Sequence, residues 1–208
     1  MSKKQFILMG DVVSSSEYNA EELREGLKQI VDLCNQQFKS DILSPLTITL
    51  GDEFQGVVKS AHAGVSILFF LEEASLKIAP FFKLHFVFHL GIIDTKINPN
   101  IAYEMMGSGL TEARQLLSDK KRGRARFKFA LQDAHSSTQL GRLFEVLDTI
   151  ILNWKKDDYP LILDMIQNSN NKEVGELHDK NRDQIWKRRK TLMIEEYNHL
   201  KTFILNYV

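Results

Sequence analysis

The chain has 208 residues, of which 43% are hydrophobic and 26% are charged, the composition of an ordinary globular protein. Its 27 basic and 27 acidic residues cancel, which excludes a general electrostatic attraction to nucleic acid or to an anionic membrane. The single cysteine, Cys34, excludes an internal disulfide and a cysteine-rich zinc site. We find no signal-peptide core, and an apolar run at 65–71 is too short to span a bilayer, so we expect a cytoplasmic protein without a membrane partner.

The first two predicted elements are a strand and a helix. The strand covers about residues 5–9 and ends at Asp11, ahead of a loop of serines. Asn19, with Glu22 three residues later, is typical of a capping box that opens a helix. Apolar residues then recur at a helical period and are expected to share one face: Leu23, Leu27, Ile30, Val31, Cys34 and Phe38.

A strand pair, a second helix and a long strand follow. Gly51 and Asp52 predict the turn of a hairpin whose second strand covers 54–58. Ser60 can cap a helix that continues to about residue 77. The stretch 82–93 alternates apolar residues with mixed ones, which predicts a strand with one face in the core.

Three further elements complete the first part of the chain: a short strand near 101–104, a helix over about 110–119, and a strand over 125–129. A basic turn at 120–123 precedes the last of these. One face of this strand carries Arg124, Arg126 and Lys128, and we interpret it as an exposed face or edge that charge protects from aggregation.

A polar segment near residue 135 separates the first part of the chain from a second part whose sequence predicts only helices. An amphipathic helix covers about 140–154, and another begins near Asp158 with Pro160 in its first turn. A short helix over 172–178 and a long one over about 182–206 follow. We therefore expect an α+β domain at 1–134 and an all-helical domain at 139–208.

Carboxylates at the ends of two neighbouring strands predict a metal site. Asp11 follows the first strand and Asp52 lies in the hairpin, and a hard divalent cation bound there can hold the phosphates of a nucleotide. We therefore take Asp11, Asp52 and Glu53 as candidate ligands of Mg²⁺ or Mn²⁺. Each aspartate alone fits an ordinary turn, and Glu53 alternates away from Asp52 and fits a solvated neighbour.

Other polar residues near these strands have two interpretations. Ser14, Ser15 and Ser16 can cradle phosphate with hydroxyl and backbone N–H groups, although such a loop is also ordinary before a helix. His85 and His89 share a strand face but lie about 13 Å apart, too far to bind one metal, so we expect partly exposed histidines there.

The segment 50–54, Leu-Gly-Asp-Glu-Phe, resembles the GGDEF hairpin of diguanylate cyclases and the hairpin of class III nucleotidyl cyclases. By this resemblance Asp11 and Asp52 correspond to the metal aspartates. Residues 107–116 resemble a catalytic helix of the class III enzymes, but Thr111 replaces its asparagine and Gln115 replaces the arginine that stabilises the transition state. Arg114 is one residue early and is expected to point about a quarter-turn away.

Together with the helical second part, the order of elements resembles the SatD family of bacterial cytoplasmic proteins. The resemblance implies a ferredoxin-like palm domain of the class III nucleotidyl cyclase type, followed by helices. It also implies a purine nucleotide as ligand, with Thr111 and Arg114 beside it, and a homodimer.

Residues 170–190 resemble a helix-turn-helix, in which Val174 and Ile185 occupy the apolar packing positions and Gly175 lies where the helices cross. Asp179 and Lys180 depart from the motif at the turn. The second helix would meet phosphates and base edges in a major groove, and the alternative is a helical hairpin with a solvated basic face. The candidate DNA-binding residues are Arg182, Gln184, Lys187, Arg188, Arg189 and Lys190.

The leading hypothesis is a regulatory DNA-binding protein whose degenerate cyclase-like palm senses a nucleotide or Mg²⁺. The residues at Thr111 and Gln115 argue against enzymatic activity. The first alternative is an active metal-dependent nucleotidyl cyclase or nucleotidyltransferase using the same carboxylates. The second is a protein-interaction module in which both motifs are relics.

Overall fold

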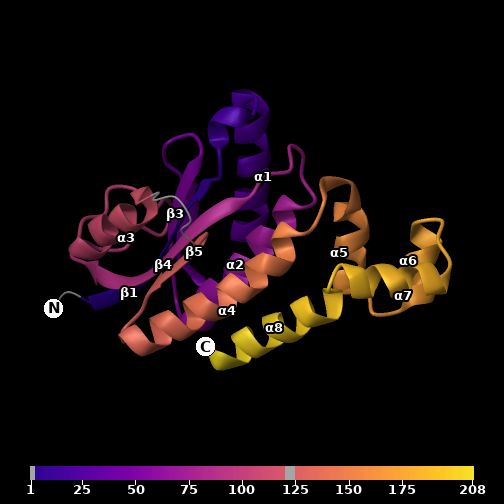
Figure 1. The fold of residues 1–208 in the computed structure, drawn as a ribbon. Helices are drawn as coiled ribbons and strands as arrows, with labels where there is room; N and C mark the ends of the chain where they lie inside the picture. Colours follow the sequence, from indigo (N-terminus) through magenta and orange to yellow (C-terminus); the bar gives the residue numbers. More distant parts are fainter. Residues whose placement is uncertain (1–2, 120–124) are drawn as a thin grey trace.

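The computed structural model describes residues 3–119 and 125–208 and contains a five-stranded sheet with helices on both faces (Figure 1). None of the described helices is both long and apolar enough to cross a bilayer. In chain order the elements are β1 (Lys3–Val12), η1 (Ser15–Glu17), α1 (Ala20–Gln37), β2 (Ile42–Ile48), β3 (Glu53–Val58), α2 (Ala61–Ser75), β4 (Leu84–Ile93), α3 (Ser108–Ser118), β5 (Phe127–Ala130), α4 (Ala134–Leu152), η2 (Lys156–Asp158), α5 (Tyr159–Gln167), α6 (Asn171–Leu177), α7 (Arg182–Thr191) and α8 (Ile194–Tyr207).

The strands are arranged in the order β2-β3-β1-β4-β5. The pairs β2–β3, β3–β1 and β1–β4 are antiparallel, whereas β5 lies parallel to β4. The first four strands with α1 and α2 therefore form a ferredoxin-like βαββαβ unit, and α3 is the crossover that a parallel fifth strand requires. The predicted α+β class is confirmed.

Helices α1 and α2 pack on one face of the sheet, and local sequence signals place both. The Asn19 side chain accepts hydrogen bonds from the N–H groups of Glu21 and Glu22, and the Ser60 hydroxyl accepts one from Ala63 N–H. Both predicted helix starts are thus confirmed. The apolar stripe of α1 from Leu23 to Cys34 is buried as expected.

Helix α3 covers the opposite face and lies very close to β4. A Cβ on Gly109 would come within 2.6 Å of Gly91 Cα, and one on Gly107 within 2.3 Å of the carbonyl oxygen of Ile92. Only glycine allows this approach. A smaller apolar cluster lies under the helix and is built from Ile7, Met9, Val57, Val87, Ile93, Ala113 and Leu117.

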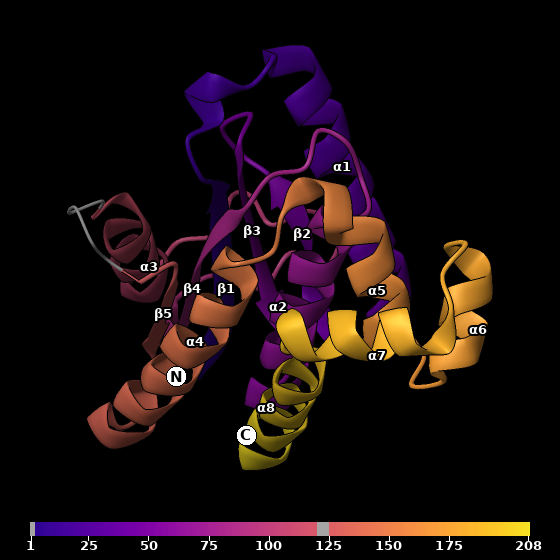
Figure 2. The same cartoon turned by 45° about the vertical axis from the view of Figure 1, so that its right-hand side comes forward.

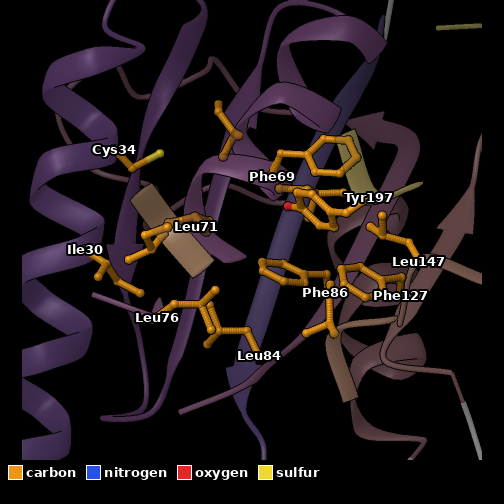
Figure 3. Close-up of a cluster of buried hydrophobic side chains, with 14 of the residues drawn as sticks. Ile30, Cys34, Phe69, Leu71, Leu76, Leu84, Phe86, Phe127, Leu147 and Tyr197 are labelled. Carbon is orange, nitrogen blue, oxygen red and sulfur yellow. The ribbon is translucent and has the colours of Figure 1, made fainter. Parts of the chain in front are cut away.

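The C-terminal helices return to the face that α2 covers, where α4 and α8 lie side by side (Figures 1 and 2). The Phe127 and Phe144 rings are 4.7 Å apart between their centroids, and Tyr197 of α8 is fully buried against Phe69 of α2 (Figure 3). One apolar cluster therefore spans the sheet and these helices. The predicted boundary, between residues 134 and 139, falls within the first turns of α4.

Two predicted elements differ from the structure. The long helix over 182–206 is two helices, because Met193 adopts a left-handed conformation, φ 54, that turns α8 back toward α2. The predicted strand near 101–104 is an irregular segment. Hydrogen bonds to the β2–β3 hairpin hold it: Ala102 N–H donates to Thr47 Oγ1, and the Tyr103 hydroxyl donates to the backbone carbonyl oxygen of Thr49.

The expectation of an exposed basic face before and along β5 is wrong for Arg126, which is 7% exposed. Its guanidinium donates to both carboxylate oxygens of Glu72, at 2.8 and 3.0 Å, and to Asp148. Burial alone would lower the pKa of Arg126, but Glu72 and then Asp148 outweigh it and raise that pKa. Arg124 and the predicted turn at 120–123 lie outside the described residues.

Candidate functional site

Three polar residues form a row across the sheet. Asp11 on β1 lies directly opposite Glu53 on β3 and opposite His85 on β4. Side chains that face each other across antiparallel strands leave the sheet on the same side, so all three belong to the face that carries α3. Glu53 does alternate away from Asp52, and this alternation is what places Glu53 beside Asp11.

Asp11 is 1% exposed, and its Oδ1 lies 2.9 Å from His85 Nδ1. A buried carboxylate requires polar partners, and His85 supplies one. From the sequence, His85 is expected to be a partly exposed strand histidine. Only the β1–β4 register identifies it, because that register sets the two residues opposite each other.

Asp52 lies in the turn between β2 and β3, where Gly51 has a φ of +85° that favours glycine. The carbonyl oxygen of Asp52 accepts a hydrogen bond from Val12 N–H at 3.1 Å, so the turn is attached to the end of β1. Asp52, whose side chain is half-buried, therefore precedes Glu53 in the chain and lies beside the end of β1 that carries Asp11.

Arg114 of α3 faces the hairpin between β2 and β3. Its Nη2 donates to Gln55 Oε1 at 3.3 Å, and its Nη1 lies 3.9 Å from Glu53 Oε2. The close contact of α3 with β4 at Gly91 and Gly109 fixes the helix at this rotation. The Arg114 side chain remains 43% exposed, so most of its donors are open to a ligand.

A cavity of about 340 Å³ adjoins Arg114. Thr111 and Gln115 line it on either side of the arginine, as exposed residues of α3. Ser14, Ser15 and Ser16 form a turn after β1, in which Ser14 is left-handed at φ 53. None of the three is among the described residues that line this cavity. Its lining comprises Gln55, Tyr103, Glu104, Met105, Leu110, Thr111, Arg114 and Gln115.

The donor chemistry of Asp11, Asp52 and Glu53 suits a hard cation, since each offers carboxylate oxygens. Within residues 3–119 and 125–208, however, no group of three or more His, Cys, Asp or Glu side chains is arranged to hold a metal ion. These carboxylates would thus supply only part of a coordination shell. A cation at this place fits only with further oxygens, such as those of a phosphate.

Arg189, one of the candidate DNA-binding residues on α7, is turned into the protein. It is 4% exposed, and its guanidinium donates to the carbonyl oxygens of Met165 and Asn168 and to Asn171 Oδ1. Two of these acceptors lie at the end of α5, where helix carbonyls lack partners within the helix. Arg189 therefore stabilises that helix end and presents no donor to a groove.

Most of the remaining DNA candidates also have internal partners: Arg188 with Asp158, Lys190 with Glu195, and Gln184 in a reciprocal capping box with Asn181. Arg182 and Lys187 remain exposed, with Asp183 beside them. Gly175 of α6 packs closely on the turn between α6 and α7, since a Cβ on it would meet the carbonyl oxygen of Lys180 at 2.4 Å. The helix-turn-helix expected over 170–190 stays a prediction.

Comparison with known proteins gives one family and a set of solved structures, two of which are described below. The SatD family model matches residues 5–202, and no curated protein matches. The catalytic core of a rhodopsin-guanylyl cyclase with converted specificity, in complex with ATPalphaS, is 15% identical, with a TM-score of 0.42 over 67% of this chain and 81% of that chain. The guanylyl cyclase Cya2 is 15% identical, with a TM-score of 0.38 over 62% of this chain and 75% of that chain. Likeness at this level transfers no activity.

Proposed function

The chain belongs to the SatD family, and on that premise we propose that it binds a nucleoside triphosphate, carried with its divalent cation, beside α3. The observation that supports this proposal is that Arg114 and the Asp11–Glu53 row face the same end of the sheet. A guanidinium matches the geometry of phosphate oxygens. Carboxylates provide the ligands that Mg²⁺ accepts together with substrate phosphates.

The cavity next to Arg114 suits the remainder of a nucleotide. Its volume of about 340 Å³ is within the usual range of ligand pockets. Tyr103 and Leu110 provide apolar surface, while Thr111 and Gln115 provide hydrogen-bonding groups. The Tyr103 hydroxyl is bonded to the hairpin, so its ring is held in place for a base to pack against.

We propose binding for regulation as the main role of this site. Stabilising a phosphoryl transition state calls for positive groups aimed at the developing charge. Arg114 is the single cationic residue among the described residues that line the cavity. Thr111 and Gln115 on either side of it are uncharged.

Isothermal titration with ATP or GTP, in the presence of Mg²⁺ or Mn²⁺, tests the proposal. We expect Arg114→Met to weaken binding about tenfold or more, the usual effect of losing a charge-assisted hydrogen bond. Glu53→Gln should remove the part of the affinity that depends on the cation. Lys187→Met, an exposed cation on α7, is the matched control and should bind as wild type does. Equal binding by wild type and Arg114→Met would refute the proposal.

A second candidate, nucleotidyl cyclisation or transfer, is favoured by the direction of Arg114 toward the carboxylates. In that reaction a ribose hydroxyl attacks the α-phosphorus, its proton leaves to a base or water, and pyrophosphate departs. Incubation with ATP or GTP and Mn²⁺ should then release pyrophosphate, and Asp11→Asn should abolish the release. Binding without any pyrophosphate would eliminate this candidate and leave the regulatory one.

A further inference from the structure

We propose that Gln55 is a positioning residue, which aims the Arg114 guanidinium and couples it to the segment 101–103. This inference rests on the proposed function, because it gives Arg114 the role of phosphate contact. Gln55 lies on β3, in the row of Met9 and Val87, two residues past Glu53. It is therefore carried by the middle of the sheet and not by a loop.

Both ends of the Gln55 amide are in use. Its Nε2 donates to the carbonyl oxygen of Ala102, and its Oε1 accepts from Arg114 Nη2 at 3.3 Å. A carbonyl oxygen and a guanidinium can each play only one role in a hydrogen bond. The amide orientation is consequently fixed by its two neighbours, since the flipped amide would lose both bonds.

The segment that Gln55 holds is itself firmly attached. Ala102 is fully buried, and its N–H donates to Thr47 Oγ1 at 3.0 Å. The next residue, Tyr103, reaches Thr49 through its hydroxyl. Ala102 is thus bonded to both strands of the hairpin, and Tyr103 is bonded to its turn. A movement of this segment would displace the Gln55 amide that orients Arg114.

The neutrality of Gln55 matters for the charge on Arg114. Glu53 stands 3.9 Å from Arg114 Nη1, beyond hydrogen-bonding distance, whereas Gln55 makes a direct bond. A neutral acceptor orients the guanidinium and leaves its positive charge for phosphate. A carboxylate at position 55 would instead pair with Arg114 and compete with the ligand.

Titration with Mn²⁺-pyrophosphate and with ATP tests this role in Gln55→Met and Gln55→Glu. We expect each variant to weaken both probes about fivefold to tenfold, with Gln55→Glu the weaker binder because it adds a charge pair. In an Arg114→Met background, Gln55→Met should cause no further loss, since Gln55 acts through Arg114. Gln29→Met, an exposed glutamine of α1, is the control.

A loss that adds in full to that of Arg114→Met would overturn the positioning role while leaving the proposed function standing. Wild-type protein that binds neither probe would overturn both. A second measurement needs no ligand: phenylglyoxal modification of Arg114, followed by peptide mass spectrometry, should be faster in Gln55→Met than in wild type. Equal rates would refute the inference on their own.

Discussion

Arg189 on α7 and Arg114 on α3 show two opposite uses of the same side chain. Arg189 is 4% exposed and gives its donors to two backbone carbonyls and one asparagine. Arg114 is 43% exposed, makes one bond to Gln55 and faces a cavity. A guanidinium has a fixed set of donors, so those used inside the protein are lost to a ligand. A run of basic residues in a sequence shows how many positive charges are present. Binding depends on how many of their hydrogen-bond donors remain accessible to a ligand.

The largest loss of stability should come from replacing Arg126, which is buried and paired with two carboxylates. Arg126→Met would leave Glu72 and Asp148 without their cation beside α4. Breaking a buried ion pair by removing one partner costs about 3–5 kcal/mol, so we expect a loss of this size in the free energy of unfolding. Urea denaturation followed by circular dichroism measures it, and a loss below about 1 kcal/mol would contradict the network's structural role.

Arg189→Met should destabilise by about 2–3 kcal/mol, because it leaves buried carbonyls at the end of α5 without donors. Its neighbour Arg188 provides a matched control. Arg188 pairs with Asp158 near the surface, and Arg188→Met should cost no more than about 1 kcal/mol. Equal losses for the two variants in the same urea experiment would contradict the larger structural role assigned to the buried Arg189.

Arg114→Met should change the free energy of unfolding by less than about 1 kcal/mol, since its contact with Glu53 is long and partly exposed. Its effect should appear in nucleotide affinity instead. Thermal unfolding of the variant with and without Mn²⁺-ATP separates the two, because a ligand that binds only the native state raises the melting temperature. A large loss of stability without ligand would show that Arg114 has a structural role like that of Arg189.

The smallest effect is expected for the double variant Arg182→Met and Lys187→Met. Both side chains are exposed on α7, and surface substitutions usually stay within about 0.5 kcal/mol. The same protein tests the predicted DNA contact. If α7 binds DNA, retention on DNA at low salt should fall in this variant and fall steeply with salt in wild type. Retention that does not change would exclude these two residues from a DNA interface.

Local signals in the sequence predicted much of the fold. Asn19 and Ser60 identified helix starts, because capping involves residues only two or three positions apart. The exposure of Arg126 was mispredicted, because its partners Glu72 and Asp148 lie 54 and 22 residues away in the chain. The break at Met193 was missed for a similar reason. The apolar pattern of the sequence continues through it, and the packing of α8 on α4, α5 and α2 favours the turn.

In the candidate site, the sequence identified the carboxylates but not their arrangement. The shared face of Asp11 and Glu53 depends on the β1–β3 register, and a shift of one residue would place Glu53 on the other side of the sheet. The positions of His85 and Gln55 depend on register in the same way. Arg114 depends on the rotation of α3, which close packing at Gly91 and Gly109 determines.

The return of α8 bears on how this chain can be divided or recombined. Tyr197 packs between Phe69 and Trp154, and its hydroxyl donates to Glu73 of α2. A stop codon after Leu192 would therefore expose the buried surfaces of Phe69 and Trp154 to solvent. Removal of an unpacked C-terminal helix would have no such effect. We expect such a truncation to lose cooperative unfolding altogether. Helix α8 is consequently part of the same folding unit as α2 and α4, and a change in its buried residues must be matched by a change in those helices.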